Sequence, residues 1–198
     1  MPPRPGLDKR LVVSAAAGLV NQEGIQALTL SRLARQLGVR TPSLYNHVDG
    51  LPGLYRELAL LNTHQLGERL RSAVIGKSGP QALAAIAQAY RAYIKEFPGL
   101  YLASLRASGT QEPVDPELQA AEARVVEVAL AVMASFGLKG EDGLHAVRGL
   151  RSVVHGFATL EIAGGFGLPL DCDESFHRMV DILIHGLQQM AKEDPNGS

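Results

Sequence analysis

The amino-acid sequence predicts an all-α protein. Along nearly the whole chain of 198 residues, apolar residues recur three and four positions apart, which is the spacing of one helical face. Runs that alternate between apolar and polar residues, the pattern of a strand, are almost absent. Alanine and leucine, which favour helices, are abundant, whereas aromatic residues make up only 5% of the chain. We therefore expect an entirely helical fold of about nine helices.

These helices are expected to form a small head and a larger body, an arrangement that a chain of this length can support. Residues 1–50 would form a three-helix head, residues 51–75 a connecting helix, residues 80–191 a helical body and residues 192–198 a tail. No apolar run approaches the roughly 20 residues that span a bilayer, and the first ten residues lack the apolar segment of a signal peptide. With a single cysteine there is no internal disulfide, so we expect a cytoplasmic protein.

Charge is distributed unevenly between the two parts. Residues 1–50 carry six basic and three acidic side chains, whereas the remainder carries 13 basic and 17 acidic ones, so the head is at +3 and the rest at −4. A basic head on an acidic body suits a protein that presents one end to a polyanion, although chance could also produce this difference. The basic arm of residues 1–6 could touch phosphates, or it could be simply disordered.

Residues 28–48 predict two short helices joined by a sharp turn. Thr29 can cap a first helix that runs to Leu37, and Gly38 supplies the left-handed residue that often follows a helix. Pro42 fits the first position of a second helix, which would end near Val48. Two helices this short, joined by about four residues with glycine in the turn, match a helix-turn-helix.

The second helix of this pair indicates DNA binding. Leu44 and Val48 lie four apart and can face the core, which leaves the polar and aromatic side chains outside. A hairpin that only packs is the alternative, but it gives Tyr45, Asn46 and His47 no role. Asn46 carries the amide that pairs with the N6 and N7 atoms of adenine. The candidate DNA contacts are Thr29, Ser31, Arg32, Arg40, Thr41, Pro42, Ser43, Tyr45, Asn46 and His47.

Residues 37–48, Leu-Gly-Val-Arg-Thr-Pro-Ser-Leu-Tyr-Asn-His-Val, resemble the recognition segment of the TetR family of tetracycline-repressor-like bacterial transcription regulators. Residues 15–30 resemble that family's first helix and the start of its second. The resemblance implies binding to a palindromic operator, with Tyr45 against a phosphate. The family usually has a lysine near the start of its fourth helix, where this chain has Leu51. We expect the corresponding phosphate contact to be lost, with lower affinity, or to pass to Tyr55 or Arg56.

Residues 153–166 are similar to the C-terminal domain of a TetR subfamily that is marked by a Trp-His-Gly motif. His155, Gly156, Leu160 and Glu161 match this motif and its surroundings, but the chain has no tryptophan.

The last two helices of the body have the spacing of a dimer interface. Apolar residues on the last helix are spaced four and three apart, a heptad seam, and Gly149, Gly156 and Ala163 recur every seven residues on the helix before it. We expect these helices to form a four-helix bundle with a second copy, as the resemblance also implies, and to place two recognition helices ~34–36 Å apart. The alternative is that a single subunit buries all these faces. The candidate interface residues are Gly149, Val153, Gly156, Leu160, Phe176, Val180, Leu183 and Leu187.

Several tyrosine and histidine residues lie among small residues in the body, so they could line an apolar cavity with a few polar anchors. No cluster of Arg or Lys looks buried, which favours a largely apolar effector, and the TetR resemblance implies effector binding in this region. These side chains could equally belong to the core, in which case the protein would be a constitutive repressor. The candidate pocket residues are Tyr90, Tyr93, Tyr101, Leu105, Met133, His155 and Phe166.

The sequence shows no arrangement of catalytic residues and no binding motif for a cofactor or a metal. No two of the six histidines have the spacing of helical metal ligands. Gly-Lys-Ser at residues 76–78 superficially resembles a phosphate-binding loop, but Arg71 stands where its first glycine is required and no strand precedes it. We therefore expect no enzyme activity and no membrane partner. The alternative to a regulator is an all-helical, dimeric binding or adaptor module that does not bind DNA.

Overall fold

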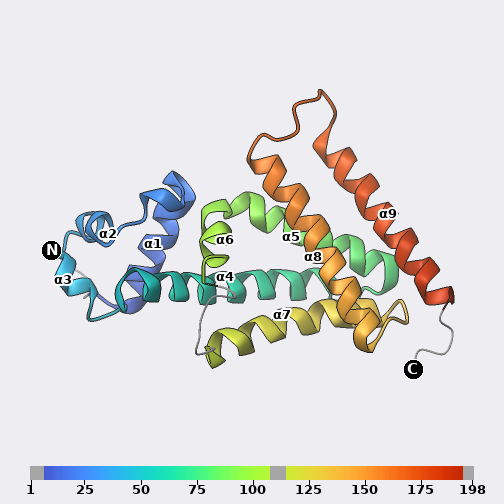
Figure 1. Ribbon diagram of the computed structural model, residues 1–198, viewed down its shortest axis with the longest axis horizontal. Coiled ribbons are helices and arrows are strands. Elements are labelled where there is room, and N and C mark those ends of the chain that lie inside the picture. Colours follow the sequence, from blue (N-terminus) through green and yellow to red (C-terminus); the bar gives the residue numbers. More distant parts are fainter. Residues whose placement is uncertain (1–6, 108–114, 194–198) are drawn as a thin grey trace. The chain divides into compact units, whose positions relative to one another are not determined.

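The computed structural model describes residues 7–107 and 115–193, and the predicted N-terminal arm and most of the predicted tail lie outside this part. The described chain contains nine α-helices, a short 3₁₀ helix and no strand, so the predicted all-α fold is confirmed (Figure 1). None of these described helices combines the length and the apolar character needed to cross a membrane.

The bounds of the elements are α1 (Lys9–Glu23), η1 (Ile25–Ala27), α2 (Leu30–Leu37), α3 (Thr41–Leu44), α4 (Gly50–Val74), α5 (Gly79–Glu96), α6 (Pro98–Ser104), α7 (Pro116–Ala134), α8 (Gly140–Ile162) and α9 (Cys172–Glu193).

The chain forms two compact units. Unit 1 comprises residues up to 64 together with residues 97–121, and unit 2 comprises residues 65–96 together with those from 122 onward. Helices α4 and α7 each contribute residues to both units. Unit 1 therefore contains more than the head expected from the sequence, because Leu54 and Leu58 of α4 and Leu100 and Ala103 of α6 lie in the core of the head.

The core of unit 1 holds its short helices in place. Helices α2 and α3 have only eight and four residues, so they depend on packing rather than on their own stability. Leu33 from α2 and Leu44 from α3 are fully buried against Val12 of α1 and Leu54 of α4. At the start of α1, the Asp8 carboxylate accepts a hydrogen bond from the Leu11 N–H at 2.7 Å and caps the helix.

Helix α6 lies against α1 at a glycine. The helix begins at Pro98, because proline suits a position that needs no N–H donor. A Cβ atom on Gly99 would lie 1.9 Å from the carbonyl oxygen of Val20, so only glycine permits this approach. The Asn21 side chain accepts a hydrogen bond from the Leu100 N–H at 2.8 Å and fixes the same contact.

In unit 2, a buried charged cluster joins α5, α8 and α9. Arg91 of α5 is only 4% exposed. It donates hydrogen bonds from Nε and Nη2 to the two carboxylate oxygens of Glu161 at 2.7 and 2.6 Å, and it pairs with Asp173 of α9 at 2.7 Å. Its guanidinium group lies 5.4 and 4.8 Å from the ring centroids of Phe157 and Phe176. The hydrogen bonds from Arg91 hold the pKa of Glu161 below its usual value, so this carboxylate stays ionised.

We predict that Gly99→Ala lowers the free energy of unfolding by about 2 kcal/mol or more, because the new methyl group collides with the backbone of α1. The matched control is Gly18→Ala in α1, where a Cβ atom meets nothing within 4 Å. That change should stabilise the protein by up to about 1 kcal/mol, because alanine is the better helix former. Thermal and urea denaturation of both variants measure the difference, and equal stability of the two would contradict the close contact.

Candidate nucleic-acid interface

A tight turn connects α2 to α3. Gly38 adopts the left-handed conformation with φ 68°, which favours glycine, and its N–H bonds to the Arg35 carbonyl at 3.2 Å. The Val39 N–H reaches back to the Ala34 carbonyl at 3.0 Å. The chain then enters α3 at Thr41 with a proline in the first turn, so a helix, a three-residue turn and a second helix follow one another as the sequence predicted.

The second helix is shorter than predicted. We expected it to run to about Val48, but α3 ends at Leu44 and the chain continues in tighter turns. The N–H groups of Tyr45 and His47 bond to carbonyls three residues back, Pro42 at 3.3 Å and Leu44 at 2.9 Å, which is the 3₁₀ pattern common at helix ends. Leu44 and Val48 are nevertheless both buried, so they hold residues 45–47 from either side.

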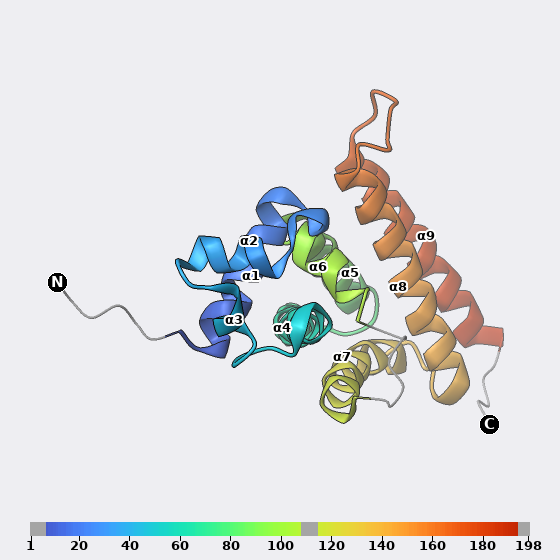
Figure 2. The same ribbon diagram turned by 60° about the vertical axis from the view of Figure 1, so that its left-hand side comes forward.

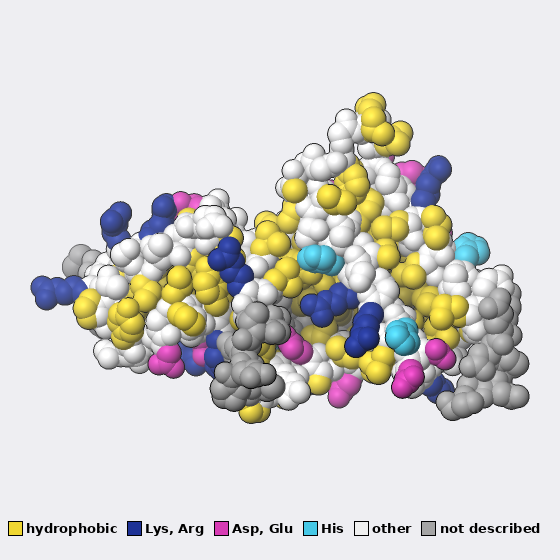
Figure 3. All heavy atoms as spheres, viewed as in Figure 1, with side chains coloured by type: hydrophobic (Ala, Val, Ile, Leu, Met, Phe, Trp, Pro, Cys, Tyr) yellow, Lys and Arg dark blue, Asp and Glu magenta, His cyan; other side chains and the backbone are white. Residues whose placement is uncertain are grey.

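Residues 41–47 present a polar and aromatic surface. Tyr45 is 58% exposed, and Pro42 and Asn46 are also exposed, whereas Thr41, Ser43 and His47 are half-buried. Lys and Arg side chains lie at the end of unit 1 that carries α2 and α3 (Figure 3). This surface can offer hydrogen bonds to base edges and positive charge to phosphates.

The first turn of α2 supplies further candidate contacts for a DNA phosphate beside this surface. Thr29 caps the helix by accepting a hydrogen bond from the Arg32 N–H at 3.2 Å, and its hydroxyl lies 3.2 Å from that of the exposed Ser31. A helix N-terminus with exposed hydroxyl groups favours a phosphate. The Arg32 guanidinium pairs with Glu23 on the surface, whereas Arg40 is exposed and has no acidic partner among the described residues.

Models of one protein family match both parts of the chain. Residues 12–49 match the model described as bacterial regulatory proteins, tetR family, and residues 83–183 match the model of the tetracyclin repressor-like C-terminal domain. The chain is 32% identical to the uncharacterized HTH-type transcriptional regulator YobS of Bacillus subtilis (strain 168), over 94% of this chain and 96% of that protein. It is 34% identical to the uncharacterized HTH-type transcriptional regulator Rv0681 of Mycobacterium tuberculosis, over 92% of this chain and 83% of that protein.

The chain belongs to the tetR family of bacterial regulatory proteins. It is a transcriptional regulator with a helix-turn-helix DNA-binding domain, and not an enzyme. The family resemblance stated from residues 37–48 is thus confirmed. Among solved structures, a TetR variant from Acinetobacter baumannii AYE in complex with minocycline superposes with a TM-score of 0.70 and 26% identity, covering 93% of this chain and 98% of that one.

Arg56 does not replace the lysine that tetR-family proteins usually have near the start of the fourth helix. Its guanidinium bonds to the Asp115 carboxylate, to Glu117 at 2.7 Å and to Glu57 at 2.9 Å. These hydrogen bonds raise the pKa of Arg56 and hold the pKa of Asp115 below its usual value. Three carboxylates already surround this cation, which disfavours the alternative that Arg56 contacts a phosphate. Tyr55 is half-buried against the core, with the Arg106 guanidinium 5.9 Å from its ring centroid.

The candidate pocket residues are divided between the two units, with Tyr101 and Leu105 in unit 1 and the others in unit 2. Within unit 2, Tyr90, Tyr93 and Met133 are buried, and burial raises the pKa of the Tyr93 hydroxyl. The remaining two are less covered: Phe166 is exposed and His155 is half-buried.

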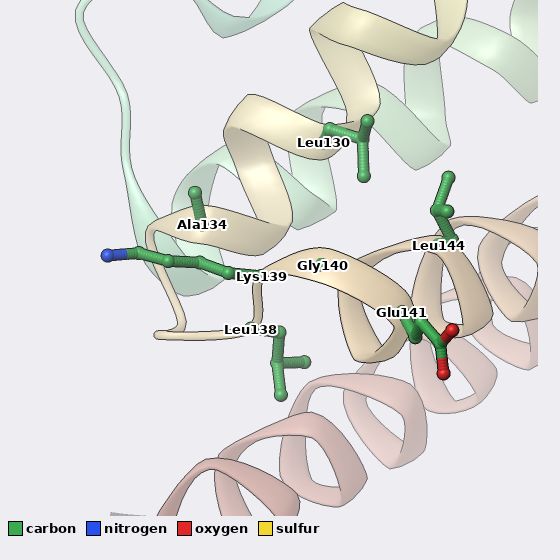
Figure 4. Close-up of a pocket in the computed structure, with 7 residues that line it drawn as sticks. All are labelled: Leu130, Ala134, Leu138, Lys139, Gly140, Glu141 and Leu144. Atoms are coloured by element: carbon green, nitrogen blue, oxygen red, sulfur yellow. The ribbon is translucent and has the colours of Figure 1, made fainter. Parts of the chain in front are cut away.

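Two hollows in unit 2 have other linings. One lies at the turn from α7 to α8, with a volume of about 560 Å³ (Figure 4). It is lined by Leu130, Ala134, Leu138, Lys139, Gly140, Glu141 and Leu144. The other, of about 430 Å³, is lined by Gln88, Arg91, Ala92, Lys95, Glu96 and Asp173. One basic side chain that lines it, Arg91, is buried, and Glu161 and Asp173 neutralise its charge.

Three of the eight predicted interface residues face the inside of unit 2. Phe176, Val180 and Leu187 are buried by their own chain, and the Phe176 ring meets the Phe157 ring edge-on at 5.1 Å. These three side chains are thus unavailable to a second copy, which corrects the sequence prediction for them. Leu183 is half-buried.

The adjacent faces of α8 and α9 are the uncovered ones. On α8, Leu160 is exposed, Val153 is half-buried, and a Cβ atom on Gly149 or Gly156 would meet nothing within 4 Å. On α9, Ile182 is among the most exposed apolar side chains of the described chain. Figure 2 shows α8 and α9 side by side, and the two helices contact each other within unit 2.

Two arginines test the charge assignment of the interface. We predict that Arg40→Gln weakens binding to all duplex sequences and reduces the slope of log affinity against log salt by about 1, because one phosphate contact is lost. Arg56→Gln is the matched control and should leave the slope unchanged, because its carboxylate partners keep it from DNA. Fluorescence anisotropy at several salt concentrations measures both slopes. A reduced slope for Arg56→Gln together with an unchanged one for Arg40→Gln would refute the assignment.

Proposed function

We propose that this tetR-family regulator is a homodimeric repressor that binds a palindromic operator through residues 41–47 of both copies. The observation that carries the proposal is that Tyr45 and Asn46 are exposed, whereas Leu44 and Val48 on either side are buried and hold the segment in place. A recognition segment needs side chains that reach outward from a rigid support.

The side chains of the interface divide by role. Thr41, Pro42, Ser43, Asn46 and His47 lie where base edges would be read, and Asn46 suits an adenine. We assign the contacts with the DNA backbone to side chains that carry a charge or an exposed hydroxyl group, and to Tyr45 because of the family resemblance. They are Thr29, Ser31, Arg32, Arg40 and Tyr45.

The proposed dimer uses the uncovered faces of α8 and α9. Leu160 and Ile182 provide exposed apolar side chains, and Gly149 and Gly156 leave room for a neighbouring helix to come close. A two-fold axis would then present two recognition segments ~34–36 Å apart, one turn of DNA, which a palindrome matches. Such a protein works where the chromosome is, so we place it in the cytoplasm.

The proposed effector is a small, largely apolar molecule that binds the helical body and weakens DNA binding. The solved TetR variant in complex with minocycline supports this class of partner. Burial and the charge of Arg151 lower the pKa of His155, so this candidate anchor is neutral at neutral pH and suits an uncharged ligand. Release from DNA requires that the effector bind two states of the protein with different affinities.

Selection of duplexes from random DNA, followed by affinity measurements, tests the proposal. A palindrome with half-sites one turn apart should emerge. We predict that Asn46→Ala costs roughly 1–3 kcal/mol of binding free energy, confined to particular base pairs, because a base-reading amide is lost. The control is Gln26→Ala, which removes an exposed amide from η1 of the same unit.

The outcomes separate the alternatives. An equal loss for all sequences would show that Asn46 does not read bases. Failure to enrich any DNA would favour an adaptor module. If DNA is enriched but no tested compound weakens its binding, the result would favour a constitutive repressor.

A further inference from the structure

The loop between α8 and α9 presents an apolar tip to solvent. Leu168 is 75% exposed and Leu170 is 71% exposed, and no charged residue occurs between Glu161 and Asp171. The loop extends beyond the ends of both helices (Figure 1), and hydrophobic side chains gather at its tip (Figure 3). An ordered loop that exposes side chains of this kind is typical of an interaction surface rather than of a simple connection.

Local hydrogen bonds fix the first half of the loop. Gly164 follows α8 with φ 69°, and its N–H bonds to the Glu161 carbonyl at 3.0 Å. The Gly165 N–H bonds to the Leu160 carbonyl at 2.8 Å. The Phe166 ring then packs on the Phe157 ring at a centroid distance of 4.7 Å.

The second half of the loop is fixed by the start of α9. The Asp171 carboxylate accepts hydrogen bonds from the Asp173 N–H at 2.6 Å and the Glu174 N–H at 3.1 Å, which caps the helix. The Leu170 N–H bonds to the Leu168 carbonyl at 2.8 Å, so the tip itself is a tight turn.

A single buried guanidinium joins the two stems of this loop. Arg91 holds Glu161 on the side of α8 and Asp173 on the side of α9. Because Arg91 is buried on α5, it anchors both stems to the core of unit 2. A tip held in this way loses little conformational freedom when it binds, so more of its apolar contact contributes to affinity.

The charges around the tip exclude a polyanionic partner. Asp171, Asp173 and Glu174 follow the apolar residues directly, and nucleic acid or an anionic membrane would be repelled by them.

The position of the tip favours a second copy of the chain. Eleven large hydrophobic side chains are exposed among the described residues; the loop carries Phe166, Leu168 and Leu170, and the adjoining faces of α8 and α9 carry Leu160, Ile182 and Met190. A stable interface buries about 800 Å² per partner. Three exposed apolar side chains on two helices are few for that area, and the loop that joins these helices doubles their number.

We infer that residues 164–170 form a pre-organised arm that packs against a second copy of this chain and extends the α8–α9 interface. The inference rests on the proposed dimer, since without it the arm has no partner.

The experiment compares dimer dissociation constants of the full chain by sedimentation velocity over a dilution series. The double change Leu168→Ser and Leu170→Ser should raise the dissociation constant at least about tenfold, because two apolar contacts are lost. The far-UV circular dichroism spectrum should not change, because both side chains are exposed in the single chain and do not support its fold. The matched control is Ile75→Ser, which removes an apolar side chain that is also 71% exposed. Ile75 lies just after α4, outside α8, α9 and the loop between them. This control should leave the constant unchanged.

Ile182→Glu separates failure of the arm from failure of the dimer. If Ile182→Glu weakens the dimer and the double loop variant behaves like Ile75→Ser, the arm is refuted and the α8–α9 dimer stands. If neither variant changes the mass, both proposals fail.

A second readout reports on the arm directly. Leu168→Cys in a Cys172→Ser background is labelled with an environment-sensitive fluorophore, and its emission should shift to the blue as the dimer forms. The same label at Ile75→Cys should not shift. Equal emission from the two labels throughout would contradict the arm.

Discussion

The proposed recognition of DNA depends on the burial of Leu44 and Val48 in unit 1. Helix α3 is a single turn, and an isolated turn of helix is not stable in water. The core of α1, α2 and α4 supplies the missing stability by covering these two side chains, while the residues between them stay exposed. The same packing therefore stabilises the fold and orients the side chains that we propose to read bases.

In unit 2, a buried charged side chain, Arg91, joins the helices. A buried guanidinium is tolerated only when it is paired, and Arg91 has Glu161 and Asp173 as partners and two aromatic rings beside it. Hydrophobic packing alone would let α9 slide along its heptad seam, whereas a directional pair specifies one register. Arg56 has a comparable role in unit 1, where it joins the N-terminal part of α4 to the start of α7.

Local patterns predicted most of the fold. The caps at Thr29 and Gly38 and the proline in the first turn of α3 involve neighbours in sequence, so the sequence alone predicts the helix-turn-helix. The exact end of α3 could not, because it depends on how residues 45–50 enter α4. The ion pairs of Arg56 and Arg91 join residues about 60 and 70 positions apart, and no spacing rule links them. The heptad seam of α9 marked an apolar face correctly but could not say which element covers it.

Hydrogen–deuterium exchange of the full chain, with and without its selected operator, tests most directly whether the segment held by Leu44 and Val48 contacts DNA. The account predicts slower exchange for residues 29–32 and 40–47 in the complex and no change in the middle of α9. Protection that is absent from residues 40–47 while DNA is bound would contradict it.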